Sequence, residues 1–179
     1  NATRSGGGIF NESESRVVNC LVYDNNATYS GGGIFNYVAG SVANCVIYGN
    51  TGGSVGGGIF NYASGAINCI IRGNSSEDII DYRSGQSHYC CYGTGGVAGA
   101  NNITQDPLFV NTSGDPSTWD FQLQEDSPCI DSGVDSQSMS LMIGTFTFEA
   151  PDNDREGIPR PQDGDLNGAE AFDMGAYEA

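Results

Sequence analysis

The sequence predicts an all-β fold: a parallel β-helix of about four coils over residues 1–101, followed by an irregular, acidic capping region over residues 102–179 that packs on the solenoid. The first observation is a hexapeptide, Gly-Gly-Gly-Ile-Phe-Asn, that recurs with a constant period at Gly6–Asn11, Gly31–Asn36 and Gly56–Asn61. The second is an Asn-Cys pair that recurs with nearly the same period. Fixed periods of this length indicate a solenoid, whose coils bury their core against one another.

The third observation is the absence of apolar residues at helical spacing, which favours strands throughout each coil. A coil is expected to begin with the glycine run, because a turn there carries no Cβ penalty. A short Ile-Phe-Asn strand follows, then a polar corner, then a β-branched strand such as Val17–Tyr23. Alternation along that strand predicts that Val18, Cys20 and Val22 point inward.

Two kinds of side chain recur at fixed positions and are expected to stack between coils. The cysteines are predicted to form an internal stack of free thiols, since parallel stacked side chains point the same way rather than at each other. The asparagines are predicted to hydrogen-bond one another and the turn backbone, a structural role. The cysteine stack is Cys20, Cys45 and Cys69; the two asparagine ladders are Asn11, Asn36, Asn61 and Asn25, Asn50, Asn74.

A fourth, degenerate coil is expected after the clean repeats. Ile79–Tyr82 stands where Ile59–Tyr62 would recur, and the loop Gly93–Ala100 then breaks the period. The region from Asn102 onward is non-repetitive and contains proline. It offers short strand candidates at residues 106–111, 119–123 and 139–148, and it is interpreted as a cap, because a solenoid needs its strand edges protected.

Charge limits the class of function. The chain carries 22 acidic residues, six arginines and no lysine, for a net charge of −16. Sixteen of the acidic residues lie in residues 106–179. Such a balance argues against nucleic-acid binding, which needs basic side chains on the phosphates. No run reaches the roughly 20 apolar residues that span a bilayer. An extracellular or cell-surface location and cation binding are favoured.

Calcium is the cation that the acidic region suggests. Residues 163–168, Asp-Gly-Asp-Leu-Asn-Gly, have the oxygen spacing of a calcium loop, with Asp163, Asp165 and Asn167 as candidate ligands. The usual glutamate at the twelfth position is missing, and Glu170 or Asp173 could substitute for it. The alternative interpretation is an acidic surface turn.

Aromatic residues form a further row in the coils. If these rings point outward, they make a strip suited to stacking on sugars or binding a partner protein; if inward, they are core. The sequence leaves the direction open, with packing or stacking between coils favoured. The row is Phe10, Phe35 and Phe60, with Tyr37, Tyr62 and Tyr82 close by.

The C-terminal region also carries an ordered set of motifs: 106–109 (DPLF), 120–123 (DFQL), 127–133 (SPCIDSG), 157–160 (GIPR) and 173–178 (DMGAYE). Together with the coils they resemble bacterial secreted right-handed parallel β-helix proteins, the type with a choice-of-anchor Q region and repeats like those of polymorphic outer-membrane proteins. The resemblance implies a surface or secreted protein, mostly without an assigned activity. Cys90 or Cys91 is expected to bond Cys129, tying the cap to the solenoid, and the resemblance favours Cys91; the alternative is three free thiols.

Three classes of function follow. Polysaccharide lyases and hydrolases include parallel β-helices, but they need a basic residue or paired carboxylates. Here Asp24 and Asp81 have no evident carboxylate partner one coil away. A carbohydrate-binding or adhesive module is the second class. The favoured expectation is a non-catalytic structural module, either part of a longer solenoid or self-assembling head-to-tail into a filament through an uncapped first coil that begins at Asn1.

Overall fold

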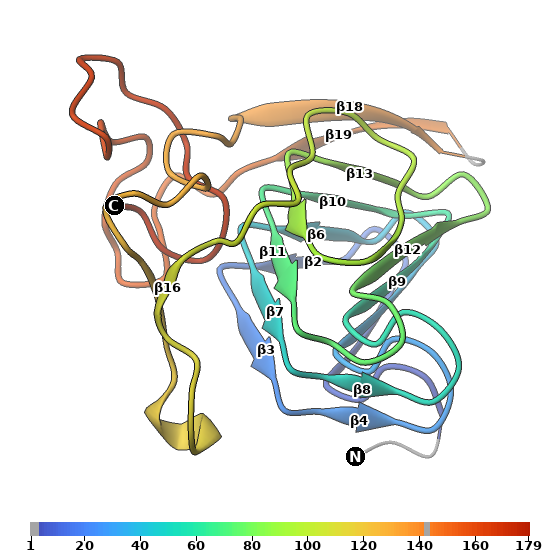
Figure 1. The fold of residues 1–179 in the computed structure, drawn as a ribbon. Coiled ribbons are helices and arrows are strands. Elements are labelled where there is room, and N and C mark those ends of the chain that lie inside the picture. The colour runs from blue at the N-terminus through green and yellow to red at the C-terminus, as the bar shows by residue number, and fades with distance from the viewer. Residues whose placement is uncertain (1–3, 142–143) are drawn as a thin grey trace.

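The predicted parallel β-helix is confirmed. In this computed structural model, which describes residues 4–141 and 144–179, the coils stack as parallel strands into a β-solenoid of about four turns (Figure 1). Asn1, where the first coil is expected to begin, lies outside the described residues. We number the coils by their position in the repeat: coil 1 ends at Asn25, coil 2 is Asn26–Asn50, coil 3 is Thr51–Asn74, and coil 4 begins at Ser75.

Three parallel sheets run along the solenoid. The first has the order β1-β5-β9-β12-β15, the second β13-β10-β6-β2 and the third β14-β11-β7-β3. A small pair, β4 and β8, completes the coils. The strands of the first sheet are β1 (Ile9–Glu12), β5 (Ile34–Tyr37), β9 (Ile59–Tyr62), β12 (Ile79–Tyr82) and β15 (Gly95–Gly96). Those of the second are β2 (Arg16–Val18), β6 (Ser41–Ala43), β10 (Gly65–Ile67) and β13 (Gln86–His88). The rest are β3 (Leu21–Tyr23), β7 (Val46–Tyr48), β11 (Ile70–Arg72), β14 (Cys91–Tyr92), β4 (Asn26–Ala27) and β8 (Thr51–Gly52).

The register of these sheets follows the repeat. Phe10 pairs with Phe35 and Phe35 with Phe60, so one period of the repeat is one turn of the helix. The degenerate fourth coil keeps the register, because Asp81 pairs with Asn61. The interior is filled by the isoleucines of the first sheet, the cysteine stack and alternate residues of the other two sheets.

One expectation about side-chain direction was wrong. The segment from Val17 to Tyr23 is not a single strand, because Asn19 has a left-handed backbone conformation with φ of 51° and divides it into β2 and β3. Asn44 and Asn68 repeat the corner, and asparagine tolerates this conformation better than most residues. The corner shifts the alternation by one residue. Val17 therefore faces the interior, while Val18 packs against the outer cluster that covers the second sheet.

The glycine run is required by close packing as well as by a turn. Gly31 has a φ of +64°, a conformation that disfavours residues with a Cβ. Gly57 meets the neighbouring coil, since a Cβ added there would lie 1.8 Å from the Ser75 carbonyl oxygen. The middle glycine therefore allows two coils to approach at a distance that no side chain permits.

The C-terminal region lies along the sides of the coils. A hairpin of β16 (Phe109–Asn111) and β17 (Asp120–Leu123), linked through the 3-10 helix η1 (Pro116–Thr118), packs on the outer face of the third sheet. A second hairpin, β18 (Ser136–Leu141) and β19 (Gly144–Glu149), covers the second sheet, where Met139 contacts the outer cluster. Figure 1 shows this hairpin lying across β13, β10 and β6.

The C-terminal end of the solenoid carries a shortened, irregular coil. β15 pairs with β12 over two residues, and Ile103 forms a bridge with Cys91. The amide of Tyr89 donates to the carbonyl of Ala100. Residues 93–103 thus lie over the strands of coil 4. Among the described residues, no helix is long and apolar enough to cross a membrane.

Candidate functional site

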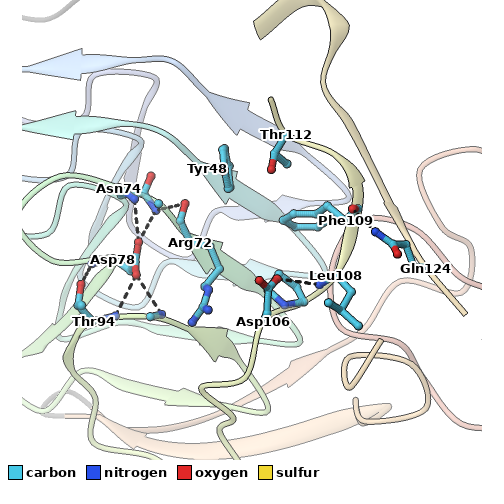
Figure 2. A pocket seen from close by; sticks show the side chains of 13 residues that line it. Tyr48, Arg72, Asn74, Asp78, Thr94, Asp106, Leu108, Phe109, Thr112 and Gln124 are labelled. Carbon is cyan, nitrogen blue, oxygen red and sulfur yellow. Dashed lines mark hydrogen bonds between the residues drawn. The ribbon is translucent and has the colours of Figure 1, made fainter. Parts of the chain in front are cut away.

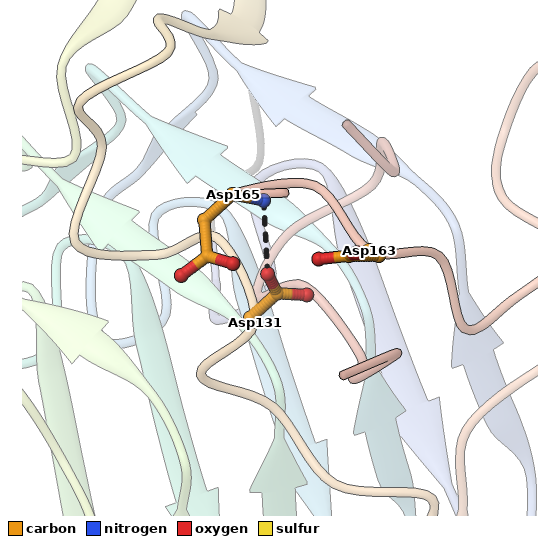
Figure 3. Close-up of side chains that lie close together, drawn as sticks. All are labelled: Asp131, Asp163 and Asp165. Atoms are coloured by element: carbon orange, nitrogen blue, oxygen red, sulfur yellow. Dashed lines mark hydrogen bonds between the residues drawn. The ribbon is translucent and has the colours of Figure 1, made fainter. Parts of the chain in front are cut away.

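The strongest candidate for a ligand site is a cluster of three carboxylates, Asp131, Asp163 and Asp165. One oxygen of each lies within 4.8 Å of the others. Figure 3 shows the three side chains turned toward one another, from two segments of the C-terminal region. Like charges this close repel unless a cation lies between them. The arrangement therefore favours a divalent cation with oxygen ligands.

Backbone hydrogen bonds position these carboxylates and leave two oxygens without a donor. Oδ2 of Asp131 accepts from the amide of Asp165 at 3.0 Å, and Oδ2 of Asp163 accepts from the amide of Gly168 at 3.0 Å. The Oδ1 atoms of Asp131 and Asp163 are shielded from solvent and accept no hydrogen bond. Buried polar atoms without partners are costly, and a bound cation would satisfy both.

The structure brings together only some of the calcium ligands that were expected from the sequence. Asp163 and Asp165 meet in the cluster. Asn167 lies beside it, with its amide donating to Oδ2 of Asp165 at 2.9 Å. Glu170 is exposed and outside the cluster. Asp173 is also outside it, because its two oxygens accept from the backbone amides of Asp131 and Ala179. Asp131 belongs to the cluster but was missed by sequence reasoning.

A second group of charges is buried and is connected to this cluster by the hydrogen bond from the Asp131 amide to Asp173. Arg160 forms an ion pair with Glu178, and both side chains are almost fully buried. The guanidinium also donates to the carbonyls of Asp173 and Gly175. Burial raises the pKa of Asp173 to about 6 and that of Glu178 to about 7. All four oxygens of these two carboxyls accept hydrogen bonds from the protein itself, an arrangement that holds the end of the chain in place.

The raised pKa of Glu178 predicts a pH-dependent stability. An unfolded glutamate titrates near 4.5, whereas the folded one titrates near 7. Between these values the folded protein holds a proton that the unfolded chain releases. The contribution of Glu178 to the free energy of unfolding is therefore full below about pH 4.5 and is lost as the pH rises through about 7. We expect the melting temperature, measured with a chelator present, to be higher at pH 5 than at pH 8, and Glu178→Gln to flatten this slope. An equal slope in Glu178→Gln and in the exposed control Asp126→Asn would contradict the assignment.

A cleft of about 530 Å³ opens between the third sheet and the β16–β17 hairpin (Figure 2). Arg72 enters it from β11, and its guanidinium donates to the carbonyls of Tyr92 and Thr104. Asp78 lies at its edge and is 3% exposed. The Asp78 carboxylate accepts from Asn74, from the amide of Gly93 and from that of Thr94. The charged side chains of Arg72 and Asp78 in this cleft are therefore hydrogen-bonded to the protein itself, where they stabilise coil 4.

The aromatic row lies on the outer face of the first sheet. Phe10, Phe35 and Phe60 alternate with the buried isoleucines and asparagines of the same strands. Their rings stack between coils, with centroids 5.2 Å apart for Phe10–Phe35 and 5.3 Å apart for Phe35–Phe60. Most ring faces are therefore covered by the next ring. Phe10, at the end of the row, is 53% exposed and Phe60 only 9%.

The cysteines form two groups. Cys90 extends the interior stack of Cys20, Cys45 and Cys69 by one coil, and burial raises the pKa of Cys45 and Cys69, which keeps them protonated. Cys91 and Cys129 lie together under the β16–β17 hairpin. The structure has these two as thiols in hydrogen-bonding contact, where the resemblance implied a disulfide. The bond itself stays a prediction.

A third row of asparagines anchors the C-terminal region, a role that sequence reasoning missed. The side-chain amides of Asn19, Asn44 and Asn68 donate to the carbonyls of Asn153, Asp173 and Val134. These are the corner residues with left-handed backbone, whose side chains project outward. The recurrence of Asn before each cysteine was the available signal.

The two predicted asparagine ladders lie inside the coils. In each, the Nδ2 group of one asparagine donates to the Oδ1 atom of the asparagine one coil later, at 2.8 to 3.1 Å. Asn36 and Asn61 are fully buried. None of the family models, curated proteins and solved structures compared with the chain matches it.

Proposed function

We propose that the chain is a non-catalytic structural β-helix module of a cell-surface or secreted protein. The observation that supports this most is the use of its charged groups: Asp78 at the edge of the cleft, and the buried Asp173 and Glu178, are hydrogen-bonded to the protein's own backbone and side chains. A carboxylate pair for glycoside hydrolysis must instead face a substrate and a water. The resemblance to bacterial secreted β-helix proteins fits the same role.

The test is a search for polysaccharide cleavage. The purified chain is incubated with neutral and uronate-containing polysaccharides, with and without calcium, and products are followed by new reducing ends and by absorbance of unsaturated sugars. No product is expected. Product formation that is lost in Arg72→Ala, a change in the cleft between the third sheet and the β16–β17 hairpin, would overturn the proposal in favour of a lyase or hydrolase.

Calcium would stabilise this module at the carboxylate cluster. Asp131, Asp163 and Asp165 offer hard oxygen ligands, and two of these oxygens have no other partner. The bound ion would join residues 131 and 163–165, which are linked here by the hydrogen bond from the Asp165 amide to the Asp131 carboxylate. Sites of this kind in extracellular modules bind calcium at about 10⁻⁴ to 10⁻³ M. Such an affinity suits the proposed location.

Calcium is therefore expected to raise the stability of the native chain. At a calcium concentration ten to one hundred times Kd, the gain is about 1.4 to 2.7 kcal/mol. We expect Asp163→Asn to abolish this gain and Glu170→Gln, which alters an exposed carboxylate outside the cluster, to leave it intact. Thermal unfolding with calcium and with a chelator measures both. An equal gain in the wild type and Asp163→Asn would show that calcium binds elsewhere.

A carbohydrate-binding or adhesive role is the second candidate. It is favoured by the aromatic row, whose end residues Phe10 and Tyr82 are 53% and 44% exposed. Aromatic rings bind sugars through a free ring face, and stacking between coils covers most of these faces. A glycan array tests it directly. Binding that is lost in Phe10→Ala would favour this role over a purely structural one.

A further inference from the structure

The two asparagine ladders have a direction. In the first ladder, Asn11 donates to Asn36, and Asn36 donates to Asn61. In the second, Asn25 donates to Asn50, and Asn50 to Asn74. Every hydrogen bond from one ladder asparagine to the next therefore has its donor on the N-terminal side and its accepting Oδ1 atom one coil further toward the C-terminal end. The second hydrogen of the Asn50 and Asn74 amides is used differently, since these amides also donate to the carbonyls of Val22 and Ile47 one coil back.

Each ladder ends on an aspartate in coil 4. Asn61 donates to Oδ1 of Asp81 at 2.8 Å, and Asn74 donates to Oδ1 of Asp78 at 2.9 Å. A carboxylate only accepts hydrogen bonds. The last asparagine of each ladder must therefore turn its NH₂ group toward the aspartate, which leaves its Oδ1 atom facing the preceding coil. The asparagine of that preceding coil must then donate in turn, so every side-chain amide of the ladder takes the same orientation. The aspartates set the direction of the whole ladder.

The remaining oxygens of these aspartates close the C-terminal end. Oδ2 of Asp81 accepts from the amide of Ala98 at 2.9 Å, and Oδ2 of Asp78 accepts from the amides of Gly93 and Thr94. Neither carboxylate can donate to another coil. The last strand at this end, β15, has only two residues, both glycine, and short edge strands are poor templates for pairing.

The N-terminal end is complementary to one more coil. β1, β2 and β3 of coil 1 are the edge strands of their three sheets. Among the described residues, no donor reaches the Oδ1 atoms of Asn11 and Asn25. Phe10 has no ring stacked on the side away from Phe35 within the described part of the chain, and it is far more exposed than Phe60.

We propose that coil 1 binds a further coil of the same Gly-Gly-Gly-Ile-Phe-Asn repeat, in parallel register, whose two asparagine side chains donate to Asn11 Oδ1 and Asn25 Oδ1. This inference rests on the proposed structural role and names its partner. It disfavours head-to-tail stacking of identical chains. In such a stack the C-terminal end of one solenoid would meet coil 1 of the next, and that end presents the carboxylate oxygens of Asp81 and Asp78 where hydrogen-bond donors are required.

The experiment adds such a coil to the full chain. A copy of residues 26–50 is placed directly before Asn1, which keeps the phase of the repeat. We expect the melting temperature to rise by about 5 °C or more, and the backbone amides of Ile9–Glu12 to exchange with solvent at least tenfold more slowly. The matched control carries Asn36→Asp and Asn50→Asp in the added copy only, so that carboxylates face the two open oxygens. It should lose most of both effects.

Three outcomes would overturn the inference. The first is that the Asp-containing coil stabilises the chain as well as the Asn-containing one. The second is that the amides of Ile9–Glu12 exchange as fast in the extended chain as in the original, which includes the case in which the added coil does not fold. The third is that the original chain forms filaments in sedimentation experiments. The first two leave the structural role proposed above intact, because that role is tested separately by polysaccharide cleavage.

Discussion

Gly57→Ala is expected to destabilise the protein by about 3 kcal/mol or more, the upper part of the range for overpacked sites. The added Cβ would lie 1.8 Å from the Ser75 carbonyl oxygen and under 3 Å from two further backbone atoms of that residue. Backbone atoms cannot turn aside as a flexible side chain can, so coils 3 and 4 must separate. Urea unfolding followed by circular dichroism measures the loss.

Gly96→Ala is the matched control for this change. Gly96 lies in β15, and an added Cβ there meets no atom within 4 Å. Its effect is expected to be small or slightly stabilising, because alanine restricts the unfolded chain more than glycine does. If Gly57→Ala unfolds at the same urea concentration as Gly96→Ala, the close contact between the coils is not as described.

Asp78→Asn is expected to cost about 2 to 5 kcal/mol, although it changes a single oxygen to nitrogen. Asp78 accepts four hydrogen bonds, two at each oxygen, from Asn74, Gly93 and Thr94. An asparagine keeps only one acceptor oxygen, so whichever way it turns, two N–H donors face its NH₂ group. At a site 3% exposed, water cannot easily replace the lost acceptor.

Asp126→Asn, the same chemical change at an exposed position, is the control, with an expected effect within about 0.5 kcal/mol. Thermal unfolding of both variants at pH 7 provides the comparison. Similar melting temperatures for the two would mean that Asp78 does not terminate the ladder as an acceptor of these four hydrogen bonds. A loss confined to Asp78→Asn would support the closed C-terminal end.

The repeat made the coils predictable, because each period of the sequence forms one turn of the solenoid. Residues at the same position in successive periods therefore lie next to each other in adjacent coils. The direction of side chains was harder to predict. Val17 and Val18 are both apolar, and both are partly or fully buried, one in the interior and one beneath the β18–β19 hairpin. Hydrophobicity alone cannot distinguish these two environments. The left-handed conformation at Asn19 decides between them.

The carboxylate cluster shows what local spacing could not supply. Asp163 and Asp165 were found through a loop pattern, but Asp131 belongs to a distant segment of the sequence, before the β18–β19 hairpin. It reaches the cluster because its own amide is held by Asp173 at 2.7 Å and its carboxylate by the amide of Asp165. Such contacts depend on tertiary packing of irregular segments, for which the sequence offers no period.

The asparagine ladders carry a consequence for how this protein ages. Deamidation converts an asparagine to an aspartate, which removes the donor from the rung while leaving its acceptors. At Asn36 this would place two acceptors against each other deep inside the coils, since Asn61 Oδ1 would lose its donor and meet a carboxylate. A buried, unpaired charge at this position would destabilise the packing of the coils against each other. Aspartate is tolerated only at the last position of each ladder, where Asp81 and Asp78 accept hydrogen bonds and no further asparagine needs a donor.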